Sequence, residues 1–165
     1  MNYLMLNVML ALIWAMLNGE INPANLVTGF VVGYLILLIA QGALGPSQYF
    51  GRVSNLFRFA AFFLFELIKS NFKVARDVLT NQHYMKPRII AVPLDAKTDT
   101  EITLLANLIS LTPGSLSLDI SDDKQVIYVH VMYAEDAEAA KREIKDGLES
   151  WVLKLLSSEK KETLS

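Results

Sequence analysis

The sequence of 165 residues contains no cysteine, and its first third contains almost no charge. The absence of cysteine excludes a disulfide framework, a cysteine-ligated zinc site and a thiol nucleophile. Residues 1–51 contain no lysine or arginine and one acidic residue, Glu20. Charged residues make up 19% of the chain and hydrophobic residues 53%. This composition argues against a soluble enzyme, a disordered chain and a nucleic-acid binder with a broad basic face.

The charges that are present divide the rest of the chain into two blocks. Residues 52–88 hold seven basic and two acidic residues, a net charge of +5. Residues 89–165 hold eight basic and fourteen acidic residues, a net charge of −6. A nearly uncharged apolar front, a basic middle and an acidic back together indicate a membrane segment followed by a water-exposed domain.

Two uncharged apolar runs, at about 2–17 and 24–41, predict a helical hairpin in the membrane. The first run has no basic residue before it and no small-residue cleavage site after it, so we expect it to be retained rather than removed as a signal peptide. The residues between the runs, which include Asn18, Gly19 and Pro23, predict a tight turn. Thr28, Gly29 and Gly33 predict a face of small residues through which two helices pack closely.

A third helix is predicted over residues 53–80, after a Gly- and Pro-rich break. Its first half is strongly apolar, and its second half is amphipathic. If this helix spans the bilayer, the chain has three spans; if it lies in the interface, the chain has two and all seven basic residues share one side. We take three spans as the working prediction. Both arrangements place the C-terminal part in the cytoplasm.

A small α/β domain is predicted over residues 89–157, after a linker at 84–88, so that residues 1–83 form the membrane domain. The pattern gives the order βαββα, a split-βαβ-like arrangement with helices on one face of the sheet. The expected strands are 89–94, 115–120 and 125–133, and the expected helices begin at a Thr98–Glu101 capping box and at Ala134. Leu116, Leu118 and Ile120 are expected to share one face, and residues 158–165 to form a frayed tail.

Few residues offer a functional site. No nucleophile–base pair, metal-ligand spacing or phosphate-binding loop is visible, so we predict no catalytic, cofactor or metal residues and a non-enzymatic protein. Glu66 lies in an apolar run and is a candidate for an ion path or, paired with Lys69, for an interface. Lys69, Lys73 and Arg76 form a candidate surface for anionic lipid or for a protein partner.

The chain resembles the E subunits of the Mrp-type multisubunit Na⁺/H⁺ antiporters of bacteria. The resemblance rests on the N-terminal hairpin and on the segments KSNFKVARDVL (69–79), ANLISLTPGSLSLDI (106–120) and YVHVMY (128–133). It implies a non-catalytic accessory subunit, needed for assembly and activity, in a multi-pass plasma-membrane complex that exports Na⁺ in exchange for H⁺. The implied partners are the other subunits of the complex and the lipid bilayer, with no nucleic acid. The alternative is a membrane-tethered sensor whose cytoplasmic domain binds a small ligand.

Overall fold

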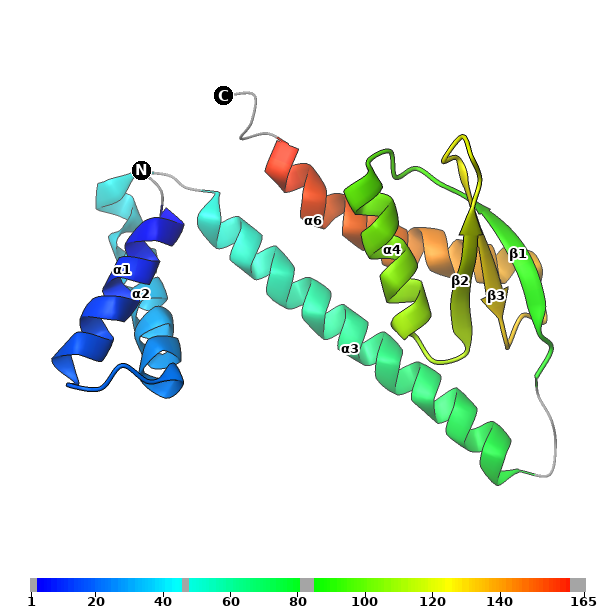
Figure 1. Ribbon diagram of the computed structural model, residues 1–165, viewed down its shortest axis with the longest axis horizontal. Helices are drawn as coiled ribbons and strands as arrows, with labels where there is room; N and C mark the ends of the chain where they lie inside the picture. Colours follow the sequence, from blue (N-terminus) through cyan, green and yellow to red (C-terminus); the bar gives the residue numbers. More distant parts are fainter. Residues whose placement is uncertain (1–2, 46–47, 81–84, 161–165) are drawn as a thin grey trace. The chain divides into compact units, whose positions relative to one another are not determined.

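The computed structural model describes residues 3–45, 48–80 and 85–160. The chain forms two compact units, and the boundary between them in the sequence lies between Asn55 and Leu56 (Figure 1). The elements in chain order are α1 (Tyr3–Leu17), α2 (Pro23–Leu44), α3 (Tyr49–Leu79), β1 (Arg88–Pro93), α4 (Asp99–Leu111), β2 (Ser115–Ile120), β3 (Val126–Val131), α5 (Ala137–Arg142), the π-helical η1 (Glu143–Glu149) and α6 (Ser150–Lys160). The membrane domain over residues 1–83 stays a prediction.

In the first unit, α1 and α2 form the predicted antiparallel hairpin (Figure 1). A Cβ atom at Gly29 would lie 2.8 Å from Cβ of Trp14 and 2.9 Å from Cα of Ala11, so the approach of the two helices requires glycine there. Gly33 meets α1 in the same way, against Asn7. The face of α1 that is buried repeats every four residues, at Tyr3, Asn7, Ala11 and Ala15.

Thr28 is not part of this close-packed face. Its side-chain hydroxyl donates to the backbone carbonyl of Ala24 at 2.8 Å, and the residue is exposed. A threonine in a helix satisfies its hydroxyl against the preceding turn in this way, so the predicted packing face consists of the two glycines.

The break between the second and third helices is shorter than predicted. α2 continues to Leu44, and α3 begins at Tyr49 rather than at residue 53. Tyr49 and Phe50 extend α3 backwards because they pack on the hairpin within the first unit. Nδ2 of Asn7 donates to the hydroxyl of Tyr49 at 2.8 Å, and the ring of Phe50 meets that of Tyr3 edge-on at 5.5 Å.

In the second unit, the three strands pair in the order β1–β3–β2, and both pairings are antiparallel. The strands β1 and β2 are therefore parallel to each other, are joined through α4, and have β3 between them. This is the split-βαβ topology that the sequence predicted, with the Val- and Ile-rich β3 in the centre.

One face of the sheet carries the core. Ile90 pairs with Val129 and Val92 with Ile127, and all four are buried. They pack against apolar residues of α4, η1 and α6, among them Leu105, Leu108, Ile109, Ile144, Leu148 and Val152. The predicted capping box opens α4: the Thr98 hydroxyl accepts from the backbone of Glu101 at 3.3 Å, and the Glu101 carboxylate accepts from the backbone of Thr98 at 2.9 Å.

The predicted single apolar face of β2 is wrong. Leu116 and Leu118 are exposed, because Ser117 between them turns toward α4 and donates to the carbonyl of Ala106 at 3.1 Å. A β-bulge between Ser117 and Asp119 then shifts the alternation by one residue, and Ile120 packs on the core.

The C-terminal helix differs from the single helix predicted over 134–157. It begins at Ala137 after the N-cap Asp136, passes through seven residues of π-helix in η1, and continues to Lys160. The predicted tail at 158–165 therefore begins inside α6, and residues 161–165 lie outside the described residues. The predicted linker at 84–88 is short in the structure, since Lys86 already bridges to Tyr133 and β1 starts at Arg88; residue 84 lies outside the described residues.

Candidate functional site

The candidate site lies in the second unit, where α3 packs against the C-terminal helix. Phe62 stacks on Trp151 with ring centroids 5.6 Å apart, and Phe59 meets the same ring at 6.5 Å. Phe59 belongs to the buried core of the unit, and Phe62 and Phe63 pack against that core. One face of the apolar first half of α3 thus packs against the α/β core, a contact that the sequence did not predict.

One turn further along, three predicted site residues gather around an acid that the sequence analysis did not select. Nζ of Lys69 lies 2.7 Å from Oε1 of Glu143 and 3.4 Å from Glu66, and Nζ of Lys73 lies 4.0 Å from Glu143. Glu143 is the first residue of η1, and α3 and η1 are 74 residues apart in sequence at this contact. We call Glu66, Lys69, Lys73 and Glu143 the charged seam. Arg76, the fourth predicted residue, lies on an exposed flank of α3.

Within the charged seam, Lys69 and Glu143 each favour the ionised form of the other. The hydrogen bond to Glu143 raises the pKa of Lys69 above its usual value, although burial works against it. Burial also opposes ionisation of Glu143, yet the hydrogen bond from Lys69 and the charge of Lys73 outweigh it and lower the pKa of Glu143. An ion pair this exposed stabilises the fold by about 0–1 kcal/mol. The charged seam therefore contributes little to the free energy of unfolding, and its effect is to orient α3 against η1.

Beside the seam is a cavity of about 360 Å³ between α3, η1 and the end of β3. Its apolar lining residues include Phe62, Ile109 and Ile144. Its polar lining residues are Glu66, Ser70, Lys73, Thr112, Ser115, Tyr133, Glu143 and Asp146. Among the residues that the structure describes, no group of three or more His, Cys, Asp or Glu side chains is placed to hold a metal ion.

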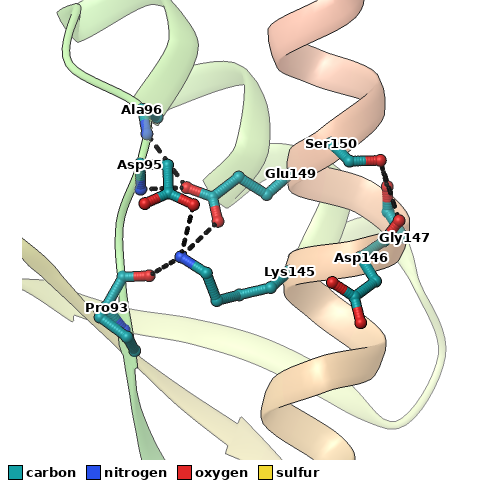
Figure 2. Close-up of polar contacts among 8 residues, drawn as sticks. All are labelled: Pro93, Asp95, Ala96, Lys145, Asp146, Gly147, Glu149 and Ser150. Atoms are coloured by element: carbon teal, nitrogen blue, oxygen red, sulfur yellow. Dashed lines mark hydrogen bonds and ion pairs between the residues drawn. The ribbon is translucent and has the colours of Figure 1, made fainter.

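A second polar cluster, which sequence reasoning missed, fixes the loop between β1 and α4 (Figure 2). Glu149 is 1% exposed, and its Oε1 accepts from the backbone of Asp95 at 2.6 Å and of Ala96 at 3.0 Å. Nζ of Lys145 lies 3.2 Å from Oε2 of Glu149, lies 2.9 Å from Asp95 and donates to the carbonyl of Pro93 at 2.7 Å. The one available signal was the four-residue spacing of Lys145 and Glu149 on a helix.

The cluster is a structural clamp. Burial opposes the charge of Lys145, but hydrogen bonds to Asp95 and Glu149 outweigh it and raise the pKa of Lys145. A buried carboxylate whose oxygen accepts two backbone N–H groups closes the loop without leaving those groups unpaired. Both clusters therefore use Lys–carboxylate pairs to position neighbouring segments of the α/β unit.

The comparison with known proteins decides what kind of protein carries these features. A family model described as a Na⁺/H⁺ ion antiporter subunit matches residues 7–155. The chain belongs to this antiporter-subunit family. The resemblance drawn from the sequence motifs is confirmed.

Individual relatives of this antiporter subunit agree over almost their whole length. The E subunit of the Na⁺/H⁺ antiporter of Alkalihalophilus pseudofirmus is 37% identical over 152 residues, which are 92% of this chain and 96% of the relative. That of Bacillus subtilis is 35% identical over 146 residues, 88% of this chain and 92% of the relative. Nothing in these matches supports the alternative of a small-ligand sensor.

Two solved structures contain similar chains. One is the membrane-bound sulfane sulfur reductase, an archaeal respiratory membrane complex, with a TM-score of 0.55, 25% identity, and coverage of 91% of this chain and 96% of that chain. The other is the Mrp complex of Dietzia, with a TM-score of 0.47, 28% identity, and coverage of 60% of this chain and 93% of that chain. The first likeness extends over the hairpin and the α/β unit of this antiporter subunit.

Proposed function

We propose that this chain is a non-catalytic accessory subunit of a multisubunit antiporter that exports Na⁺ in exchange for H⁺ across the bacterial plasma membrane, and that the complex needs it for assembly and activity. The observation that carries this proposal is the family match over residues 7–155, which includes the hairpin and the α/β unit together. Its partners are the other subunits of the complex and the lipid around them.

The hairpin supports a packing role rather than an ion-conducting one. α1 and α2 contain no charged residue, whereas ion-coupled transporters place ionisable groups at membrane depth. The outer surface of the hairpin exposes large apolar side chains, including Met5, Met9, Ile13, Val31 and Ile39. In water such a surface would be costly, so we expect lipid and neighbouring subunits to cover it.

For the membrane topology, we propose that α1 and α2 both cross the bilayer. In the described part of the chain, α2 is the one helix long and apolar enough to cross by itself; its 22 residues rise roughly 33 Å. α1 is apolar but has 15 residues, so it requires a thinner bilayer or tight contact with α2. The basic block at 52–88 supports a cytoplasmic location for the α/β unit.

We propose that Glu66 lies near the cytoplasmic membrane–water interface, paired with Lys69, and is not part of an ion path. Its side chain is 19% exposed, pairs with Lys69 and lines the cavity beside η1. The substitution Glu66→Gln is then expected to lower transport modestly while assembly stays intact. Complete loss of Na⁺-dependent proton flux in an assembled Glu66→Gln complex would contradict this role.

The proposed accessory role is tested by extraction and reconstitution. A tagged chain, solubilised from its own membrane in mild detergent, is expected to purify with several hydrophobic partners. Deleting the chain is expected to abolish Na⁺-dependent proton flux in everted vesicles, and restoring it to recover the flux. The purified chain alone in liposomes is expected to give no cation-coupled proton flux. Flux from the chain alone, or purification without partners, would refute the proposal.

A further inference from the structure

α3 has a second apolar side, which faces away from the α/β core. The exposed side chains at helical spacing on this side are Phe57, Leu64, Phe65, Ile68, Phe72 and Leu79, which we call the α3 stripe. Phe57 is 69%, Phe72 72% and Leu79 84% exposed. At 100° per residue the stripe lies opposite Phe59 and Glu66, which pack toward the core.

The charges of α3 are sorted by side as well. Arg58 and Arg76, five helical turns apart, are exposed along one border of the stripe. The two acids of α3 point elsewhere: Glu66 faces the cavity, and Asp77 is 6% exposed. The stripe is thus an apolar surface bordered by arginine and free of acid, the pattern of a helix that lies on an anionic membrane surface.

The packing of α3 argues against its crossing the bilayer. Trp151 and Glu143, on the C-terminal helix, contact α3 directly through Phe62 and Lys69. If this part of α3 were at membrane depth, the charged residues of η1 would be carried into the hydrocarbon with it, at a cost of several kcal/mol for each charge. A helix in the plane of the interface puts the stripe in lipid and leaves the α/β core in water.

The chain connection favours the same surface. α3 starts five residues after the last residue of α2, and its first residues, Tyr49 and Phe50, pack on the hairpin within the first unit. Since α2 leaves the bilayer at Leu44 in the proposed topology, α3 starts at the level of the headgroups. A helix tethered there begins beside the lipid headgroups.

We propose that residues 57–79 of α3 lie in the plane of the cytoplasmic membrane surface, with the α3 stripe in the boundary between headgroups and acyl chains and Arg58 and Arg76 against anionic lipid phosphates. The α/β unit is held on the water side through the other face of the same helix. This inference rests on the proposed membrane placement of the hairpin.

The absence of cysteine makes the test direct. Single cysteines replace Phe57, Leu64 or Phe72 in the stripe, and Asn71→Cys, at its border, and Asp122→Cys, in the exposed β2–β3 turn, serve as controls. The full chain is spin-labelled and reconstituted in phosphatidylcholine vesicles with or without one quarter phosphatidylglycerol. Collision with oxygen and with a water-soluble nickel chelate then gives the depth of each label.

We expect the three stripe labels to be oxygen-accessible at one shallow depth, about 5–10 Å below the phosphates, and the two control labels to be chelate-accessible. A depth that increases along the helix, with Leu64→Cys near the bilayer centre, would show a spanning helix and overturn the proposal. Stripe labels as chelate-accessible as Asp122→Cys would overturn it too. In the assembled complex, labels shielded from both reagents would assign the stripe to a neighbouring protein of the complex, with the same consequence.

The contribution of anionic lipid is tested separately. Replacing Arg58 and Arg76 together by Gln is expected to reduce the depth of the Phe72→Cys label in vesicles with phosphatidylglycerol and to leave it unchanged in pure phosphatidylcholine. If the double substitution left the depth of the Phe72→Cys label unchanged in vesicles with phosphatidylglycerol as well, the assignment to anionic headgroups would be overturned. Because these depths are measured on the chain alone, they are independent of whether the chain purifies with partners.

Discussion

Replacing Glu149 by Gln tests whether the clamp between η1 and the β1–α4 loop stabilises the α/β unit. The carboxylate is 1% exposed and accepts hydrogen bonds from the backbone of Asp95 and Ala96. An amide of the same shape keeps an oxygen for these two donors but removes the charge and the ion pair with Lys145.

The size of the effect follows from these contacts. A hydrogen bond to a charged group contributes about 1.5–3 kcal/mol, and a neutral acceptor gives about half of that. Two such bonds weakened together predict a loss of about 1.5–3 kcal/mol in the free energy of unfolding of the unit. For a domain of about 100 residues this lowers Tm by roughly 6–12 °C.

The measurement is thermal unfolding of the full chain in detergent by circular dichroism, together with amide hydrogen exchange in the β1–α4 loop. Glu138→Gln is the matched control, because that exposed carboxylate forms a surface pair with Lys141 at 2.7 Å. We expect its Tm to change by no more than about 4 °C, since surface pairs contribute roughly 0–1 kcal/mol. Equal Tm values for Glu149→Gln and Glu138→Gln would refute the clamp.

Two further predictions concern the hairpin and the charged seam. Gly33→Ala is expected to weaken α1–α2 packing, because its Cβ would overlap Asn7, and thereby to lower the dodecyl sulfate concentration that unfolds the hairpin. Gly42→Ala is the control, since a Cβ there meets nothing within 4 Å, and it is expected to leave that concentration unchanged. Equal effects of the two substitutions would contradict the packing model. A double-mutant cycle of Lys69→Gln and Glu143→Gln should give a salt-sensitive coupling of about 0.2–1 kcal/mol. Because the pKa of Glu143 is lowered from 4.5 and the pKa of Lys69 is raised from 10.5, the coupling is expected to be fully present between pH 4.5 and pH 10.5. It is expected to be lost as the pH falls below this window, where Glu143 is protonated, or rises above it, where Lys69 is deprotonated. A coupling that persists in strong acid would argue against the ion pair.

The elements that the sequence predicted well are those with a local cause. The capping box at Thr98 and Glu101 forms as expected, because its two hydrogen bonds involve residues three apart. Gly29 and Gly33 meet α1 as expected, because two apolar runs joined by a short turn bring their small residues together. The central position of β3 likewise follows from its own β-branched composition.

The charged seam was predicted only in part. Glu66, Lys69 and Lys73 are neighbours on one helix, so their grouping is visible at spacings of three and four residues. Their partner Glu143 is more than seventy residues away and comes close only when η1 packs on α3. The same holds for Glu149, whose two backbone donors are over fifty residues distant.

By itself the sequence determined that this protein has a hairpin of two uncharged helices, a basic amphipathic third helix and an acidic α/β unit, and the motifs within them were sufficient to indicate the family. These properties depend on composition and on short-range periodicity. Tertiary structure alone decided which side of α3 meets the core, that Leu116 and Leu118 face outward, and which buried carboxylate fastens the β1–α4 loop. A helix with two apolar sides and a strand with a bulge each admit more than one orientation, and contacts with distant residues select one of them.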